Sequence, residues 1–427
     1  MKVKIRNTII ADILFWGMCL SIYLNIFDNQ SYHIFQSGLI IVMLILSGLN
    51  GVVDSFCIFT RKHKILLFAF LIWFLQTLAR GNYLWSYPSR IISVVLIIFS
   101  GYYTAKNKRD QFLEKSFQRI ELALGIATLF GIVTHLNKNN PLIYCSDSFN
   151  LYTHDYTRMT ALFVHPIPCA LFVSFFLILV IRSTHNRLLK VIGTLIGTIG
   201  LLLTLSRSAW ITVAIVILVG NWNNIVNLVK SKKIKKSTLA IIMLALFGIC
   251  LVILLQPKEI ISLVETVNKR VASKPLSSQM SFVWRVTAVG TIIVNSVKSG
   301  IISFLFGNGQ FSSAQFLQGL KFGSNISYNV ATVDNSYISV LFDFGLIGFI
   351  FLVLYVVYTF KVIRNSSNEL ARTAGFLSLS AIIMNLFYEG LYWCNSGYIM
   401  FFLIGMIIYY KDETEKNSRN EEKIVNT

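Results

Sequence analysis

Long runs of apolar residues, separated by short polar clusters, dominate the pattern along this chain. A helix needs about 20 mostly apolar residues to cross a bilayer, and most of the runs approach that length. The pattern predicts about twelve membrane spans, at 8–27, 34–53, 65–79, 90–105, 118–135, 160–181, 188–206, 209–229, 238–256, 337–360, 372–391 and 397–410. We therefore expect an all-α, polytopic membrane protein. A single transmembrane helical domain would cover residues 1–410, and a charged, disordered cytoplasmic tail would cover 411–427.

Composition agrees with this interpretation. Hydrophobic residues make up 55% of the 427 residues and charged residues only 13%, which is roughly half the charged fraction of a soluble domain. A large soluble catalytic domain is therefore excluded. The six cysteines show neither a Cys-x-x-Cys pair nor a Cys/His spacing that suits zinc. We expect no metal site and no cofactor.

The formal net charge of +19 would indicate a nucleic-acid partner in a soluble protein. In a membrane protein, Lys and Arg instead collect in the cytoplasmic loops. With the N-terminus inside, most basic residues fall on the inner side, in the segments 2–6, 61–64, 106–119, 182–190, 230–236, 361–372 and 411–423. The charge pattern therefore predicts cytoplasmic termini, with the lipid bilayer as a partner and no nucleic acid.

Two predicted outer segments, 136–159 and 257–336, are too long to be simple connections. Within the second segment, residues 286–306 are apolar enough to be mistaken for a span. Their apolar residues recur at helical spacing, opposite a polar face: Val286, Val289, Ile293, Val297, Ile301 and Phe304. This spacing is typical of an amphipathic helix. We expect a helix that lies on the membrane surface or against the bundle.

Three arginines on the predicted outer side are candidates for binding an anion. Arg207 follows Ser206 between two long apolar runs, Arg285 follows Trp284 at the start of the amphipathic stretch, and Arg158 precedes the sixth predicted span. An arginine in hydrocarbon costs about 2.5–3.5 kcal/mol on insertion scales, so each must reach the interface, a polar cavity or an anion. A guanidinium group can bind two phosphate oxygens at once. The alternative is an interfacial anchor whose long side chain reaches the headgroups.

Further candidates lie near the same predicted surface. His165 either contacts a ligand or is a hydrogen-bonded core residue. Gly307 and Gly309 form a Gly-x-Gly turn that lacks the third glycine and the βαβ setting of a dinucleotide-binding loop. The turn is either a plain one or one that lets the backbone approach a ligand. Asp334 and Asn335 precede the tenth predicted span, where such residues commonly cap a helix.

Taken in order, these fragments resemble the O-antigen ligase and polymerase superfamily of bacterial surface-polysaccharide assembly. The resemblance rests on Ser206-Arg207-Ser208-Ala209, on Arg285 followed by Gly307-x-Gly309, and on Asp334-Asn335-Ser336-Tyr337 leading into Gly345-Leu346-Ile347-Gly348. The segment from Arg158 to Pro166 is similar to the proline-containing helix of the family. The likeness extends over roughly residues 155–355 and includes the long outer loop late in the chain.

This resemblance implies a metal-independent, inverting glycosyltransferase that uses undecaprenyl-diphosphate-linked oligosaccharides at the outer face of the bacterial cytoplasmic membrane. Arg207 and Arg285 would stabilise the charge of the departing diphosphate, and Asp334 would accept the proton of the acceptor hydroxyl. The substrate-binding residues would be Arg158, His165, Ser206, Gly307, Gly309 and Asn335. Other membrane proteins of polysaccharide assembly are further candidate partners.

Ligases of this superfamily have a histidine immediately before the corresponding asparagine, whereas this chain has Asp334. The departure favours a polymerase, which joins lipid-linked repeat units of an O-antigen, capsule or exopolysaccharide. Three alternatives stay open: a ligase that moves the glycan to another acceptor, a transporter of the same lipid-linked oligosaccharide, and an O-acyltransferase built on His165. The two halves of the sequence show no internal repeat of the kind common in transporters.

Overall fold

The computed structural model describes residues 50–79, 86–107, 110–138, 158–163, 165–183, 187–222, 280–318, 333–392 and 394–425. In these residues the regular secondary structure is helical, without strands, so the all-α prediction is confirmed for this part of the chain. The predicted spans 8–27 and 238–256, and nearly all of 34–53, lie outside the described residues.

The chain divides into two compact units. The first unit comprises Met1–Ile120 and Val283–Thr427, and the second comprises Glu121–Phe282. Helix α6 (Asp110–Leu136) begins in the first unit and ends in the second. The candidate site residues are therefore divided between the units.

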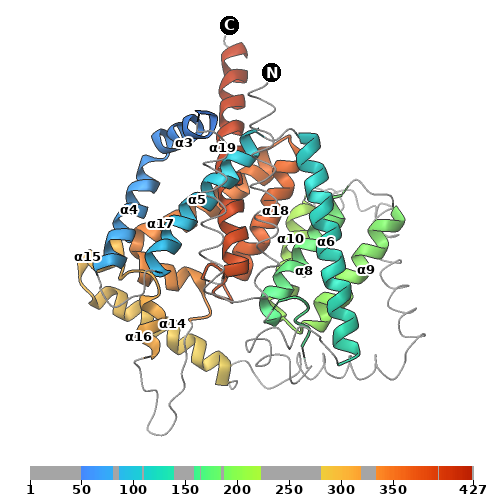
Figure 1. Ribbon diagram of the computed structural model, residues 1–427, viewed down its shortest axis with the longest axis horizontal. Coiled ribbons are helices and arrows are strands. Elements are labelled where there is room, and N and C mark those ends of the chain that lie inside the picture. The colour runs from blue at the N-terminus through green and yellow to red at the C-terminus, as the bar shows by residue number, and fades with distance from the viewer. Residues whose placement is uncertain are drawn as a thin grey trace. The chain divides into compact units, whose positions relative to one another are not determined.

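The first unit is built around the C-terminal helices, drawn from orange to red in Figure 1. Its helices are α3 (Asn50–Lys62), α4 (Lys64–Ala79), α5 (Ser86–Asn107), α14 (Met280–Lys298), α15 (Ile301–Phe306), α16 (Ser312–Gln318), α17 (Ser336–Asn365), α18 (Glu369–Met384) and α19 (Cys394–Val425). Helix α5 packs along α19, and α17 packs against α18, α19 and α15. A Cβ at Gly405 would overlap the carbonyl oxygen of Ile98, so glycine allows the close approach of α5 and α19.

The second unit contains the C-terminal part of α6 together with α8 (Pro166–Arg182), α9 (Arg187–Leu203) and α10 (Arg207–Gly220). Helix α8 is apolar all round and buried along most of its length, as expected of a central helix. It packs against α9 and α10. A Cβ at Gly197 of α9 would overlap the side chain of Leu177, so glycine again permits close packing.

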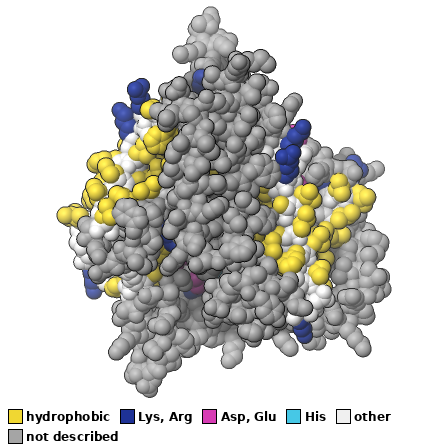
Figure 2. Space-filling model, in the orientation of Figure 1, with side chains coloured by type: hydrophobic (Ala, Val, Ile, Leu, Met, Phe, Trp, Pro, Cys, Tyr) yellow, Lys and Arg dark blue, Asp and Glu magenta, His cyan; other side chains and the backbone are white. Residues whose placement is uncertain are grey.

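In the described residues, two helical segments are long and apolar enough to cross a membrane, namely Leu113–Leu136 and Ser336–Asn365. Three shorter apolar helices cover Lys64–Leu78, Pro166–Arg182 and Arg207–Gly220. Large hydrophobic side chains are exposed on α4 and α6, and Figure 2 shows them gathered in patches with basic side chains beyond their ends. Exposed apolar faces of this kind are expected where helices contact lipid.

Several helix ends differ from the predicted spans, and two of them have a local cause. Helix α8 begins at Pro166 rather than at residue 160, because proline fits the first turn of a helix, where its missing N–H costs nothing. Helix α18 ends at Met384 rather than at residue 391, and residues 385–392 form turns. The Nδ2 of Asn385 donates to the carbonyl of Ala381 at 2.7 Å, which satisfies a carbonyl of the last turn.

Residues 411–425 continue helix α19, although the sequence pattern predicted a disordered tail from residue 411. Charge pairs account for the difference. Lys411 and Glu415 lie one turn apart, with Nζ and Oε2 at 2.9 Å, and Asp412 pairs with Lys62 of α3 at 2.6 Å. Pairs four residues apart stabilise a helix, and the contact with α3 fixes its position.

The predicted amphipathic stretch 286–306 is divided into α14 and α15 by Gly300, which has a φ of +90°. On α14 the buried residues are Ala288, Ile292 and Ser296, and Ala288 and Ile292 pack in a cluster that includes Phe342 of α17. Most of the predicted apolar stripe is exposed instead. Helix α14 therefore buries a face that contains Ala288, Ile292 and Ser296, and leaves most of the predicted stripe exposed.

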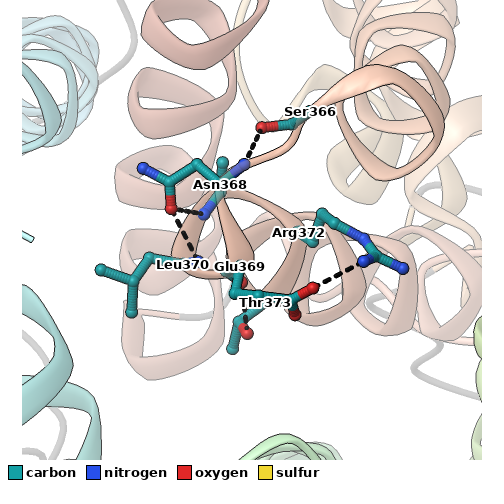
Figure 3. Close-up of polar contacts among 7 residues, drawn as sticks. Ser366, Asn368, Glu369, Leu370, Arg372 and Thr373 are labelled. Carbon is teal, nitrogen blue, oxygen red and sulfur yellow. Dashed lines mark hydrogen bonds and ion pairs between the residues drawn. The ribbon is translucent and has the colours of Figure 1, made fainter.

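The first turn of α18 shows a locally determined helix start, drawn in Figure 3. Oδ1 of Asn368 accepts from the N–H groups of Leu370 and Ala371, which is the usual arrangement of an N-cap. On the same turn, Arg372 and Glu369 form an exposed ion pair at 2.6 Å.

Candidate functional site

Arg285 of α14 and Asp334, which precedes α17, form an ion pair. Nε of Arg285 donates to Oδ2 of Asp334 at 2.9 Å. Both side chains are partly open to solvent, with exposed fractions of 44% and 30%. Within the described part of the chain, the two terminal guanidinium nitrogens of Arg285 have no hydrogen-bond partner. The guanidinium therefore keeps donors for a further anion.

Asn335, rather than Asp334, caps helix α17. Oδ1 of Asn335 accepts from the N–H groups of Tyr337 and Ile338 at 3.0 and 3.2 Å, and its Nδ2 donates to the carbonyl of Leu386 at 3.1 Å. Asp334 has a φ of +54°, a left-handed conformation in which Asp is enriched among non-glycine residues. The carboxylate of Asp334 contacts Arg285 and takes no part in this cap.

A buried carboxylate supports this turn. Glu389 lies between α18 and α19 and is 4% exposed. It accepts hydrogen bonds from the hydroxyl of Ser339 and from the N–H of Val333, the latter at 3.2 Å. Burial raises the pKa of Glu389 to about 8, opposed by these two hydrogen bonds and aided by the charges of Asp343 and Asp334. Glu389 thus holds the residue before Asp334 against α17.

Gly307 and Gly309 belong to a loop that is held against α17 by Asp343. The glycines have φ values of +89° and +94°. The N–H of Gly309 donates to the carbonyl of Asp343 at 2.9 Å, and the carboxylate of Asp343 accepts from the N–H groups of Phe311 and Ser313 at 2.8 and 2.7 Å. Asp343 itself is fully buried. The Gly-x-Gly turn therefore permits close approach to the backbone of the protein's own helix.

The same approach requires a kink in α17. Gly345 has a φ of +70° and interrupts the helical conformation. A Cβ at this position would overlap the carbonyl oxygen of Leu305, and a Cβ at Gly307 would overlap the carbonyl oxygen of Asp343. The two glycines thus allow α15 and the following loop to lie against the kink.

An aromatic contact joins this loop to α5. The guanidinium carbon of Arg90 lies 4.9 Å from the ring centroid of Phe311, and Phe311 packs edge-on against Tyr392 with centroids 5.2 Å apart. A cation over an aromatic face is attracted by the ring quadrupole. Arg90 is therefore a further cation at this end of the first unit.

In the second unit, Arg158, Ser206 and Arg207 lie around the turn between α9 and α10. Nε of Arg158 donates to the carbonyl of Thr204 at 2.9 Å. Ser206 is the N-cap residue of α10, and its Oγ lies 3.1 Å from Oγ of Ser208. Arg207 is the first residue of α10 and is half-buried. The positive end of the α10 dipole adds to the charge of these arginines.

His165 caps helix α8. Its Nδ1 accepts from the N–H of Ile167 at 3.2 Å. Burial, and then the charge of Arg158, lowers the pKa of His165 to about 4. The imidazole is therefore neutral near neutral pH, which suits an acceptor at a helix N-terminus.

The first unit thus carries Arg285, Gly307, Gly309, Asp334 and Asn335, and the second carries Arg158, His165, Ser206 and Arg207. Among these predicted residues, Arg285 and Asp334 contact each other directly. Sequence reasoning missed Asp343, Glu389 and Arg90. The sequence did contain a signal for Asp343 and Glu389, because an ionisable residue inside an apolar run indicates a structural or functional role. Within the described ranges, no three His, Cys, Asp or Glu residues are grouped to hold a metal ion.

Residues 192–353 match a family model described as O-antigen ligase. The match confirms the resemblance to the O-antigen ligase and polymerase superfamily. The matched range contains Ser206, Arg207, Arg285, Gly307, Gly309, Asp334 and Asn335. Arg158, His165 and Glu389 lie outside it. No curated protein matches the chain.

Proposed function

Proceeding from the O-antigen ligase family domain at residues 192–353, we propose that this protein is a polysaccharide polymerase. It joins undecaprenyl-diphosphate-linked oligosaccharide repeat units at the outer face of the bacterial cytoplasmic membrane by inverting, metal-independent glycosyl transfer. The observation that carries the proposal is the partly exposed ion pair of Arg285 and Asp334 at the N-terminal end of α17. It combines a phosphate-binding cation with a carboxylate base.

Arg285 binds the donor. A diphosphate can bind the guanidinium beside Asp334, because two phosphate oxygens can use the terminal nitrogens that Asp334 does not contact. As the bond between the anomeric carbon and the diphosphate oxygen breaks, negative charge develops on the leaving group. A permanently charged guanidinium stabilises this charge without a metal.

Asp334 serves the acceptor. With the donor bound at Arg285, the carboxylate of Asp334 accepts the proton of the attacking hydroxyl. The hydroxyl oxygen forms the new bond at the anomeric carbon, the diphosphate leaves with the electron pair of the old bond, and the proton rests on Asp334. Attack from the face opposite the leaving group inverts the anomeric configuration. The contacts of Glu389 and Asn335 hold the Asp334 turn in place for this step.

The test uses purified protein with a lipid-linked oligosaccharide in the presence of EDTA, with chain growth followed over time. Asp334→Asn is expected to slow chain growth by about 10²–10⁴-fold, the usual contribution of a general base. Arg285→Ala is expected to lose about 10²–10³-fold. Protein level and thermal stability should change little, because an exposed ion pair contributes about 0–1 kcal/mol.

Glu369 and Arg372 provide the matched control. They form a second exposed ion pair, at 2.6 Å on α18 (Figure 3). Glu369→Gln and Arg372→Ala should retain chain growth. Full polymer length in Asp334→Asn, or equal losses in the control pair, would contradict the assignment of Asp334 and Arg285.

The role of Arg207 follows from its sequence setting and is tested separately. If two-point phosphate contact matters, both Arg207→Lys and Arg207→Ala lose activity; if charge alone matters, Arg207→Lys retains it.

A ligase is the second candidate, because the matching family model carries that description. Product analysis separates the two activities. A ladder of repeat units that remain on the lipid carrier indicates a polymerase, and transfer of a finished glycan to a different acceptor indicates a ligase.

A further inference from the structure

The first unit contains a long cavity between four helices. Its volume is about 590 Å³, and side chains of α4, α5, α17 and α19 line it. Most of the wall is apolar, with Ile65, Phe70, Val94, Leu352 and Ile404 among the lining residues. This cavity is separate from the Arg285–Asp334 pair, since neither residue lines it.

The cavity is long enough to follow much of the bilayer. Its lining on α17 extends from Val340 to Tyr358, which corresponds to about 27 Å along a helix. The hydrocarbon core of a bilayer is about 30 Å thick. An extended hydrocarbon chain therefore matches both the length and the apolar wall of the cavity.

The two ends of the cavity differ in charge. One end is lined by Arg61, Lys62, His63 and Lys64, at the turn between α3 and α4. The other end is lined by Gln310, Leu391 and Tyr392, without a charged residue among its lining side chains. A ligand with an anionic head and a hydrocarbon chain is complementary to this arrangement only when its head lies at the basic end.

Two of the basic side chains are not neutralised within the described residues. Lys62 pairs with Asp412 at 2.6 Å, and His63 lies 3.6 Å from the same carboxylate. Arg61 and Lys64 are exposed, and no acid in the described part of the chain pairs with them. Their charges are available to a phosphate group.

We propose that this cavity binds an anionic phospholipid, with its phosphate at Arg61 and Lys64 and an acyl chain between α4, α5, α17 and α19. The basic end belongs to a segment that the charge pattern places on the cytoplasmic side, where anionic lipids gather.

The test is native mass spectrometry of the full chain after reconstitution with phosphatidylglycerol or phosphatidylcholine. The wild type should retain phosphatidylglycerol and not phosphatidylcholine. The double variant Arg61→Gln/Lys64→Gln should bind phosphatidylglycerol about 30-fold more weakly, given the usual contribution of each basic residue near an anionic lipid. Arg187→Gln/Lys190→Gln, which removes the same charge at the start of α9, should bind as the wild type does.

A second variant tests the apolar wall of the cavity. Leu352→Phe narrows the cavity and leaves Arg61 and Lys64 intact, and it should also lose the retained lipid. Equal retention in all variants would overturn the proposal, as would equal retention of phosphatidylcholine. Capture of a polyprenyl lipid or of a second protein chain in place of phosphatidylglycerol would overturn it as well.

Discussion

Replacing Asp343 tests how the loop after α15 is held. The buried carboxylate accepts the N–H groups of Phe311 and Ser313 at 2.8 and 2.7 Å. Asp343→Asn keeps one acceptor oxygen and turns an NH₂ group toward the other N–H. One buried N–H is then left unsatisfied, at a cost of about 1–3 kcal/mol. Asp343→Ala leaves both unsatisfied and costs about twice as much.

These energies set the expected rate of amide exchange. Since 1.4 kcal/mol corresponds to a factor of ten, the amides of Phe311 and Ser313 should exchange roughly 5- to 150-fold faster in Asp343→Asn. The effect in Asp343→Ala should approach the square of that factor. Hydrogen–deuterium exchange of the purified protein, followed by mass spectrometry of peptides covering residues 307–318, measures both changes.

The control is Asp412→Asn on α19, which removes a carboxylate that pairs with Lys62. It should leave exchange in residues 307–318 unchanged. Exchange within about twofold of the wild type in both Asp343 variants would refute the role of Asp343 in holding the loop, because two buried hydrogen bonds cannot be lost at so small a cost.

Two further predictions concern stability. Gly345→Ala should lower the melting temperature, because Gly345 has φ +70° and ψ −171°, a region essentially restricted to glycine that costs other residues about 1–3 kcal/mol. The added Cβ would also overlap the carbonyl of Leu305. The control is Gly290→Ala on α14, where a Cβ would meet nothing within 4 Å; it should be neutral or stabilising by up to about 1 kcal/mol. An equal fall in melting temperature in both variants would contradict the close approach at Gly345. Burial raises the pKa of the Glu389 carboxyl group from 4.5 to about 8 in the folded state. Between these two pH values the folded protein keeps the carboxyl group protonated, whereas the unfolded chain has released the proton. The contribution of Glu389 to the free energy of unfolding therefore falls as pH rises from about 4.5 to about 8. Melting temperatures of Glu389→Gln should lack this decline, and parallel pH profiles in both proteins would rule out the buried proton.

The positions of most described helices followed from the sequence alone. The starts of α4 and α9 differ by one residue from the predicted spans, and α17 begins one residue earlier than predicted. A run of apolar residues is a local property, and it dictates where a helix can be placed in lipid. Helix ends were predicted less well because they depend on single contacts. Lys62 pairs with Asp412 just beyond the predicted end of the last span, and nothing near Asp412 in the sequence indicates that partner.

In the candidate site, too, some features followed from the sequence and others from the tertiary structure. The sequence alone identified Asp334 and Asn335 as polar residues at the start of a span, and Arg285 as a cation that must reach an interface. Tertiary structure decided which residue caps α17 and which forms the ion pair, because Arg285 is 49 positions away in the chain. It also placed the buried acids Asp343 and Glu389, whose roles depend on backbone N–H groups 30 to 56 positions distant. The hydrophobicity of a segment is the sum over its own residues and can be calculated from the local sequence. The role of a buried carboxyl group instead depends on hydrogen-bond donors that are distant in the chain and that the fold brings to it.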